Sequence, residues 1–514
     1  MDPAPHRMGP RLPRPQFHPG ARSVSMTEEV LIVGAGPTGL TMAIELARRG
    51  AAVRIVDAAA APTTETRALG VQPRTLELFE KLGLAEATVA DGVPVTEFNV
   101  FSEGKRFLHL NIGALTTPHP YLLMLPQPRV EALLRARLAE HGVTVEHGVE
   151  LTALTQSPDD VRVTLHHRTG LAERAHAPWV IGCDGAHSTV RHQLAVPFVG
   201  AAFEENFAVA DVHMDWTLPY DIFYSFLNRG RFVAYFPMPG NQHRLTIAYR
   251  PGQSPGGDVT FEELQSAVDR CAPAGARVAQ VGYAGRFRIN QRKVARHSVG
   301  RVFLAGDAAH VHSVVGGQGM NTGIQDAFNL GWKLAAVVHG HAAPELLDSY
   351  AAERSPVAHR LVKGTRRATR MTLLRNPIAA FGRRHLAPHV TARPIVQRVL
   401  SRALTQLDVS YRDGTGGTED TQLEVGDRFP RIDVLDSSRF TLLHSGPKTR
   451  GLHDAIGPHA DLIDVRHDTI PACGAGLTLV RPDGYLALLD ADVRELRDYL
   501  DDTFTAPAAG QHIA

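Results

Sequence analysis

A glycine-rich turn between an apolar run and a helical pattern, close to the start of the chain, constrains the fold most. Residues 30–33 predict a short buried strand, residues 39–49 repeat apolar side chains with a helical period, and residues 53–57 predict a second strand. The turn holds three glycines with GxGxxG spacing, Gly34, Gly36 and Gly39. In this strand–helix–strand context, such a turn predicts a nucleotide-binding α/β unit.

Each position of the turn has a physical role in binding a pyrophosphate. Gly34 permits the tight turn, Gly36 lets the backbone approach the phosphates, and Gly39 allows close helix–strand packing. Thr38 immediately precedes the predicted helix, whose free N-terminal amides attract anions. Asp57, at the end of the second strand, is expected to accept hydrogen bonds from the adenosine ribose. A tight turn without ligand is the alternative, and the unit by itself does not separate FAD from NAD.

A second motif, later in the chain, decides between these nucleotides. Residues 302–307 predict a strand that ends in the carboxylate of Asp307, which suits the hydroxyls of a polyol chain. The Gly-rich run 316–321 then begins a helix whose first amides stabilise negative charge on a reduced flavin. The residues expected beneath the flavin ring are Gly319, Met320 and Asn321. Together the two motifs predict one FAD, bound at both of its ends.

Composition excludes several other classes of protein. At 514 residues the chain is long enough for two or three domains, and 44% apolar with 21% charged residues is typical of a soluble globular protein. The net charge of +1 gives no general attraction to nucleic acid, and no apolar run is long enough to span a bilayer. Three cysteines predict no disulfide framework, and a reducing, cytoplasmic compartment fits; no metal site is expected.

The chain has a distinct beginning and a distinct middle. Residues 1–27 are predicted to form a disordered leader, with Met26 as an alternative start. Alternating apolar residues over about 203–250 predict antiparallel sheet, with a hairpin turn at 239–241.

The second half ends in two further segments. Residues 354–407 hold many arginines and no acidic residue, which indicates solvated helices packed over the main body or, alternatively, a face for an anionic ligand. After a linker at 413–418, residues 421–505 predict short strands and a final helix, enough for a small third domain. Cys473 has no CxxC partner there, so packing or subunit contact is expected and a dithiol redox role is not.

These motifs resemble those of the single-component, FAD-dependent aromatic hydroxylases (group A flavoprotein monooxygenases), in particular the branch that tailors aromatic polyketides and phenolic antibiotics. The resemblance covers residues 28 to 412. The matched positions are 34–39, Arg67, Gln127, Arg129, Glu131, Asp184, Gly185, Gly306, Asp307, 316–326, Leu347, Tyr350, Glu353 and Arg354, with Asp483 and Gly484 in the C-terminal segment.

The resemblance implies an α/β fold with three domains. These are a Rossmann-like FAD-binding domain, an antiparallel-sheet substrate domain and a C-terminal thioredoxin-like domain. The implied divisions are 28–200 and 286–360 for the FAD-binding domain, 201–285 for the middle domain, 361–412 for a helical connection and 421–505 for the thioredoxin-like domain.

The resemblance also implies roles for single residues. Arg67 and Gln127 would contact FAD, and Leu151 would lie against its adenine side. Asp184 would serve the cofactor region or the passing nicotinamide nucleotide. From the residues alone, Arg67 is as readily a surface ion-pair partner, and Gln127 and Leu151 are unremarkable residues at the edge of a core.

The implied reaction is oxygen insertion. NADPH, expected rather than NADH, would reduce a flavin that moves between exposed and buried positions, and O2 would then form a C4a-hydroperoxide that transfers oxygen to a phenolic carbon of the aromatic substrate. Met320 and Asn321 would meet the isoalloxazine through backbone and side chain. The protein must supply a dry cavity rather than a catalytic triad, so His312 is the one candidate for an acid–base role, with a structural histidine as the alternative. The chain is expected to be a monomer or a homodimer.

The substrate cavity is expected between the flavin and the antiparallel sheet. Its candidate walls are Tyr224, Phe226, Tyr235 and Phe236, of which some must face elsewhere because side chains alternate along a strand. The family has a proline shortly after the loop histidine, where this chain has Val314 and Val315. Without that proline the φ angle is less restricted, which leaves the oxidation performed open.

Several alternatives stay open at this level. A flavin-dependent halogenase requires a WxWxIP-like segment, which the isolated Trp179, Trp216 and Trp332 do not form. Baeyer–Villiger oxidation or ring rearrangement on the same scaffold requires product analysis to distinguish. A non-catalytic flavoprotein has only the arginine-rich stretch in its favour. Drug inactivation and biosynthesis share these motifs.

Overall fold

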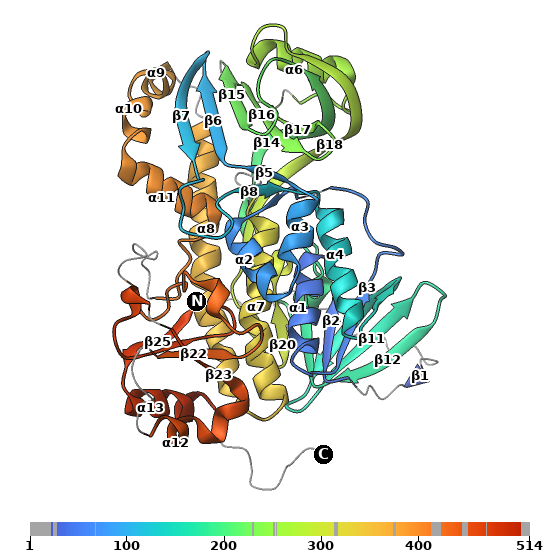
Figure 1. Cartoon of the computed structure of the whole chain (residues 1–514). Coiled ribbons are helices and arrows are strands. Elements are labelled where there is room, and N and C mark those ends of the chain that lie inside the picture. Colours follow the sequence, from blue (N-terminus) through green and yellow to red (C-terminus); the bar gives the residue numbers. More distant parts are fainter. Residues whose placement is uncertain are drawn as a thin grey trace, which may run out of the picture.

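The computed structural model describes residues 22–23, 28–66, 68–228, 231–249, 252, 254–312, 317–373, 377–412, 423–444, 451–468 and 470–504. Within this part the chain has a mixed α/β fold built on five sheets (Figure 1). Arg67, residues 313–316 and the expected linker at 413–418 lie outside the described residues, as do residues 1–21 and 24–27 of the expected leader. Arg22 and Ser23 form strand β1, which pairs in parallel with β12.

A six-stranded sheet forms the centre of the molecule. Its strand order is β19-β20-β13-β2-β3-β9, and all neighbours are parallel except the edge pair β19 and β20. The strands are β2 Val30–Val33, β3 Val53–Asp57, β9 Val145–His147, β13 Trp179–Gly182, β19 Ser298–Val299 and β20 Val302–Leu304. Strands buried on both faces need apolar side chains at every position, which is why 30–33 is a continuous apolar run.

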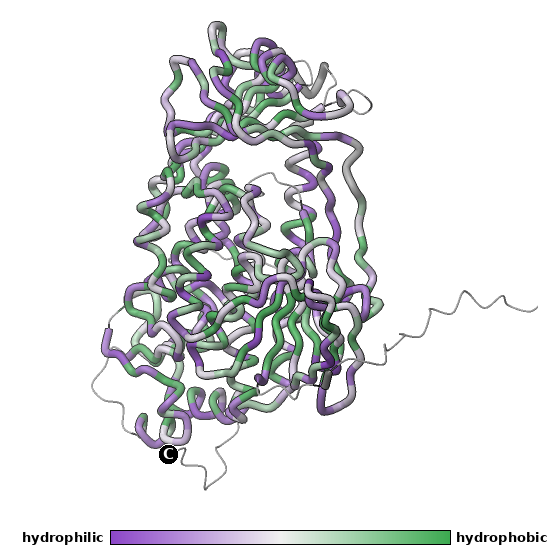
Figure 2. Tube along the Cα trace, turned by 90° about the vertical axis from the view of Figure 1, so that its right-hand side faces the viewer, coloured by the Kyte–Doolittle hydropathy of each residue, from purple (hydrophilic) through white to green (hydrophobic). Residues whose placement is uncertain are grey.

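Different layers cover the two faces of this sheet. Ile32 and Ile181 pack against helices, whereas Leu31 and Val180 pack against a second, antiparallel sheet. The helices are α1 Pro37–Ala47, α2 Pro73–Lys81, α3 Ala85–Ala90, α4 Gln127–Glu140 and α7 Gly319–Val338. The second sheet holds β10 Val149–Gln156, β11 Val161–His167 and β12 Ala172–Ala177, with α5 Thr189–Gln193 beside it. Figure 2 shows the hydrophobic strands gathered inside this body.

An eight-stranded sheet lies at the top of Figure 1, in the order β21-β18-β14-β17-β16-β15-β6-β7. The hairpin expected at 239–241 is present, with positive φ at Gly240 and Asn241 between β16 and β17. Its strands are β6 Glu97–Ser102, β7 Lys105–Asn111, β14 Phe198–Asp215, β15 Phe223–Asn228, β16 Arg231–Met238, β17 Gln242–Ala248, β18 Arg277–Val294 and β21 His310–Val311. Helix α6 Phe261–Cys271 covers one face.

A small three-stranded sheet and a group of helices connect the larger parts. The small sheet, in the order β4-β8-β5, packs against the eight-stranded sheet on the face away from α6. Its strands are β4 Gly70–Val71, β5 Val93–Val95 and β8 Leu122–Met124. The helices are α8 Asp348–Leu373, α9 Pro377–His385, α10 Ala387–Thr391 and α11 Pro394–Thr405. The arginine-rich stretch is therefore helical, as the interpretation as solvated helices predicted.

The C-terminal region forms a four-stranded sheet in the order β23-β22-β24-β25. It packs against α7 through Trp332 and Phe440, whose ring centroids are 5.3 Å apart. Its elements are β22 Phe440–His444, α12 Leu452–Ile456, β23 Ile463–His467, β24 Leu477–Val480, β25 Leu486–Ala491 and α13 Val493–Thr503. The predicted short strands and final helix are present.

Two expected domain boundaries fall inside elements. The division at 285 and 286 lies within β18, and the division at 360 and 361 lies within α8. Strands β6 and β7, from the expected FAD-binding segment, belong to the eight-stranded sheet because β6 pairs in parallel with β15. Strand pairing between distant residues is not visible in local patterns, and the domain divisions themselves stay predictions.

Candidate functional site

Segments with predicted site residues leave the central sheet at one edge. Strands β20, β13, β2 and β3 lie side by side and run parallel, so their carboxyl ends share that edge. Asp307, Asp184 and Gly36 follow the first three of these strands, and Asp57 is the last residue of β3, in that spatial order. In open α/β sheets, ligands bind outside these carboxyl ends.

The first glycine turn leaves open space in front of a helix N-terminus. A Cβ at Gly34, where φ is +102°, would lie 2.4 Å from the carbonyl oxygen of Cys183, and a Cβ at Gly39 would lie 1.9 Å from the Gly34 carbonyl oxygen. A Cβ at Gly36, in contrast, has no neighbour within 4 Å. No side chain caps α1 and no acidic residue stands in its first turn, so its free amides can bind an anion such as a pyrophosphate.

Asp57 lies beside this turn at the end of β3. Its Oδ2 accepts a hydrogen bond of 2.6 Å from the Ala35 amide, and its Oδ1 accepts one of 2.8 Å from the Ala59 amide. A carboxylate has about four acceptor positions. It therefore retains capacity for the hydroxyls of a ribose.

The two glycine motifs meet at Thr38. A Cβ at Gly306 would lie 2.4 Å from Thr38 Oγ1, and a Cβ at Gly323 on α7 would lie 2.2 Å from the same atom. The first turn of α1 thus contacts both the Gly306–Asp307 turn and the first turns of α7. Because the two motifs adjoin in this way, one extended ligand can bind both of them. The residues of the two motifs therefore fit an FAD.

This close packing gives a testable prediction for Gly323. Gly323→Ala should lower the free energy of unfolding by about 1–3 kcal/mol, because the new methyl overlaps Thr38 Oγ1. Adding Thr38→Ala should restore most of that loss, as urea unfolding of the apoprotein will show. Gly364→Ala on α8, whose Cβ meets nothing within 4 Å, is the control and should not destabilise. A wild-type free energy of unfolding in Gly323→Ala would contradict this packing. So would a double variant that is no more stable than Gly323→Ala alone.

The start of α7 has no side-chain cap and no acidic residue in its first turn. The exposed Asp307 and the buried His312 both adjoin it, since a Cβ at Gly319 would lie 4.0 Å from Asp307 Oδ1 and 3.5 Å from His312 Cε1. The side chain of Met320 packs in the core. The amides of this first turn are therefore the groups free to face a flavin.

The side chain of Asn321 bonds to another segment of the chain. Its Nδ2 donates to the Gly70 carbonyl at 2.8 Å, and its Oδ1 accepts from the Gln72 amide at 2.8 Å. The side chain is thus held within the protein, and its contact with the isoalloxazine stays a prediction. The buried amide fixes the strand that crosses beside the start of α7, and a backbone contact remains open to this residue.

Gln127 and Leu151 have different environments. Gln127 lies at the start of α4, where its Oε1 accepts from the Ala68 amide at 3.1 Å and its backbone N–H donates to the Ala68 carbonyl at 3.0 Å. Leu151 is buried in the core between β10 and the central sheet. Its side chain therefore packs within the protein, and only its backbone is available to an adenine.

Asp184 follows β13 and adjoins the first glycine turn. Its Oδ2 accepts from the Val190 amide at 3.1 Å, while its Oδ1 is buried with no hydrogen-bond partner among the described residues. Burial raises the pKa of this carboxyl group. An orphaned acceptor beside Gly34 fits a hydroxyl or a bridging water of a bound nucleotide.

A buried charge cluster joins the second motif to α8, and its residues Asp326 and Arg354 were matched to the family without a role. Asp326 Oδ1 accepts from Arg354 Nε at 2.7 Å, and Oδ2 accepts from the Gly306 amide at 3.0 Å and lies 2.7 Å from His310 Nε2. Burial opposes ionisation of Asp326, but the charges of His310 and Arg354 outweigh it and hold the pKa of this carboxyl below its ordinary value. Asp326 is seven residues after Gly319 on α7, a spacing that returns to the same helix face and is the available signal.

Three of the four candidate substrate walls face away from the motifs. Tyr224, Phe226 and Tyr235 pack with α6, because strand alternation places them together on that face. Phe236 lies on the opposite face, with its ring centroid 4.8 Å from that of Phe223 and beside strands β5 and β8. Some of the four were expected to face elsewhere, and Phe236 is the candidate on the face turned toward the central body.

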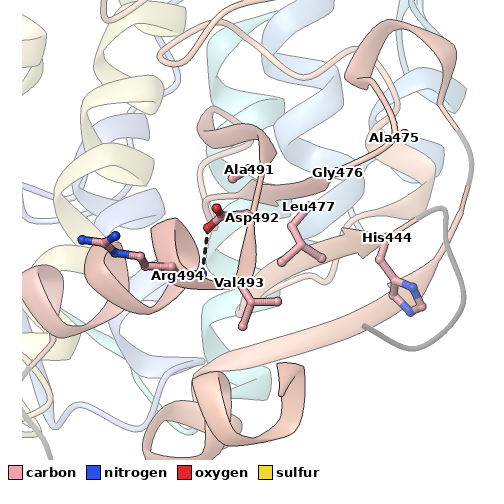
Figure 3. A pocket seen from close by; sticks show the side chains of 8 residues that line it. All are labelled: His444, Ala475, Gly476, Leu477, Ala491, Asp492, Val493 and Arg494. Carbon is pink, nitrogen blue, oxygen red and sulfur yellow. Dashed lines mark hydrogen bonds between the residues drawn. The ribbon is translucent and has the colours of Figure 1, made fainter. Parts of the chain in front are cut away.

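A surface hollow elsewhere does not coincide with this site. It has a volume of about 510 Å³ and lies in the C-terminal region, lined by His444, Ala475, Gly476, Leu477, Ala491, Asp492, Val493 and Arg494 (Figure 3). Asp492 there caps α13 through the Arg494 amide. Among the described residues, no cluster of three or more His, Cys, Asp or Glu side chains could hold a metal ion, and no helix is long and apolar enough to cross a membrane.

Two uncapped helix starts adjoin at Thr38, with Asp57 and Asp307 beside them, and this geometry fits a dinucleotide-binding protein. The FAD binding domain family matches residues 27–365. The chain belongs to this family, among its flavin-dependent monooxygenases.

Relatives over nearly the whole length agree with this assignment. The 6-methylpretetramide 4-monooxygenase of Streptomyces rimosus is 38% identical, covering 94% of this chain and 95% of its own. A 12-dehydrotetracycline 5-monooxygenase/anhydrotetracycline 6-monooxygenase of the same species is 35% identical, covering 94% and 100%. The solved structure of OxyS anhydrotetracycline hydroxylase from S. rimosus superposes with a TM-score of 0.78 at 32% identity, covering 94% and 100%. The resemblance to FAD-dependent aromatic hydroxylases is confirmed.

Proposed function

We propose that the chain uses FAD and NAD(P)H, with NADPH as the expected donor, to hydroxylate a polycyclic aromatic substrate of the polyketide type. The contact of the two glycine motifs at Thr38 supports FAD as the cofactor, because it brings both predicted FAD-binding segments together. The names of the relatives, which specify tetracycline-type substrates, support the substrate class.

Each of these FAD-binding segments has a separate role in the proposed function. The amides of α1 bind the pyrophosphate, Asp57 orients the ribose, and Asp307 holds the ribityl hydroxyls. Bound FAD supplies the electron transfer and oxygen activation that no side chain provides. The first amides of α7 stabilise negative charge on the ring, and His312 is the candidate to hold a proton from a substrate phenol.

The aromatic substrate is proposed to lie on the face of the eight-stranded sheet that carries Phe236. Phe223 adjoins it there, and the buried pair of Arg244 with Asp211, joined at 2.7 Å, lies on the same face. Apolar rings exclude water and position a planar substrate, and water exclusion protects reactive oxygen species on a flavin.

The proposed layout follows from these assignments. The central sheet with its helices is the Rossmann-like FAD-binding domain, residues 28–200 and 286–360 apart from the strands that join the eight-stranded sheet. That sheet, centred on 201–285, is the substrate domain. Residues 361–412 connect to a thioredoxin-like C-terminal domain at 421–505, which the βαβββα order of β22 to α13 supports.

Asp307→Ala tests the cofactor assignment. The purified variant should lose most of its FAD while remaining folded, because an exposed carboxylate that binds the ribityl chain contributes little to the apoprotein. The flavin-to-protein absorbance ratio measures this loss. Asp502→Ala, on the exposed side of α13, is the control and should keep the wild-type ratio. An unchanged ratio in Asp307→Ala defeats the assignment.

Oxidation of NADPH with a panel of polycyclic phenols and quinones tests the reaction itself. A product heavier by one oxygen, with its ring skeleton intact, is expected. An inserted ring oxygen would identify Baeyer–Villiger chemistry instead. A protein that binds FAD but oxidises no NADPH with any of these substrates would be a non-catalytic flavoprotein.

A further inference from the structure

The turn between β24 and β25 inserts between two helices of the flavin-binding body. This turn, residues 481–485, is called the C-terminal wedge below. On one side Arg74 Nη2 of α2 donates to the Asp483 carbonyl at 2.7 Å. On the other side Asn329 Nδ2 of α7 donates to Asp483 Oδ2 at 3.3 Å. Arg74 is fully buried and Asp483 is 2% exposed, so the wedge is enclosed by both helices.

The same two helices also meet at the flavin motif. Asn321, in the first turn of α7, bonds to the amide of Gln72, the residue that precedes α2. Arg74 follows two residues later. The contacts therefore form a closed ring, from α7 at Asn321 through Gln72 and Arg74 to Asp483, and back to α7 at Asn329.

Buried charges hold the wedge in this ring. Arg481 of the wedge bonds to Asp483 at 2.6 Å and to Glu353 of α8 at 2.6 Å. Arg74 pairs with Glu77 at 2.8 Å and lies over the ring of Tyr485, 5.0 Å from its centroid. Displacing a buried charged group without its partner is strongly unfavourable, so the wedge cannot shift while the helices stay in place.

We propose that the C-terminal wedge is a positioning element of the flavin site, which acts through Arg74 to keep the start of α2 against the first turn of α7. The C-terminal region is then part of the cofactor-binding unit rather than a separate appendage. This inference rests on the proposed function only in taking FAD as the ligand of α7.

The test compares two residues of α2 that both bond to the C-terminal region. Arg74, at the start of α2, contacts the wedge, whereas Lys81, its last residue, donates to the Asp436 carbonyl. Arg74→Met leaves Glu77 paired with Arg428 at 2.9 Å, so no charge is orphaned. Lys81→Met is the matched control, since it removes a buried contact to the same region at the far end of the helix.

Two measurements on the full-length protein are made for each variant. Flavin fluorescence titration of the apoprotein gives the FAD dissociation constant, and hydrogen exchange gives the protection of the amides at 70–72. Arg74→Met should raise the dissociation constant about tenfold and speed that exchange about tenfold, because charge-assisted hydrogen bonds are lost. Lys81→Met should change neither.

Equal effects in both variants would overturn the proposal, because they would indicate general loosening of the C-terminal region. So would wild-type FAD binding in Arg74→Met. If Arg74→Met does not fold, Gly484→Ala replaces it: its Cβ would lie 3.0 Å from Arg74 Nη2, at a φ of +80°, and it keeps every charge. Should the wild-type protein bind no FAD, the proposed function fails, while the exchange at 70–72 still tests the positioning.

Discussion

Gly36→Val should fold normally and retain almost no FAD. The backbone at Gly36, with φ −73° and ψ −177°, is extended and suits valine, and a Cβ there meets no atom within 4 Å. The apoprotein therefore loses no packing. The two methyl groups, however, occupy the space in front of the α1 amides, where the pyrophosphate must approach. We expect the FAD dissociation constant to rise about 100-fold or more, corresponding to about 2.7 kcal/mol.

The absorbance ratio of flavin to protein and the melting temperature of the apoprotein together check this expectation. Gly256→Val is the matched control, since its Cβ also has no neighbour within 4 Å and it lies in a loop before α6. That control should keep its FAD. Normal FAD affinity in Gly36→Val would show that no phosphate approaches this turn.

Arg354→Met should cost about 3–5 kcal/mol of unfolding free energy, the largest stability effect expected for any substitution proposed for this chain. Arg354 is 1% exposed, pairs with Asp326 and also donates to the Thr322 carbonyl at 3.1 Å. Its loss leaves the buried carboxylate of Asp326 with the His310 ring and the Gly306 amide as its remaining partners among the described residues. The turn at Gly306 should loosen as well, because its amide donates a hydrogen bond to the same carboxylate.

Chemical unfolding of the apoprotein measures this cost. The control is Arg431→Met, which breaks a pair with Asp433 at 2.8 Å whose side chains are 47% and 63% exposed. Exposed pairs contribute about 0–1 kcal/mol, so the control should remain near wild-type stability. Comparable losses of unfolding free energy in both variants would show that the buried Asp326 cluster stabilises the fold no more than an exposed ion pair does.

The local parts of the flavin site could be predicted from short stretches of sequence. The strand at 30–33, the three glycines and Asp57 depend on neighbouring φ/ψ angles and on burial period, which a few residues specify. The same holds for the hairpin turn at 239–241.

Other parts of the candidate site could not be placed from the sequence because they depend on pairing between distant residues. Tyr224, Phe226 and Tyr235 were candidate walls, but the register of β15 with β16 and the position of α6 place them on the far face. Asn321 was expected at the flavin through its side chain, which instead bonds to Gly70 and Gln72.

By itself, then, the sequence determined which ligand class this protein is built for, because each half of the FAD signature is encoded within a short segment whose geometry is local. Only the tertiary structure decided that both halves meet at Thr38, that Phe236 is on the inner face of its sheet, and that the turn at 481–485 braces α2 against α7. Those relations arise from packing and buried charge pairing between residues far apart in the chain, and such contacts leave no periodic trace in any one segment.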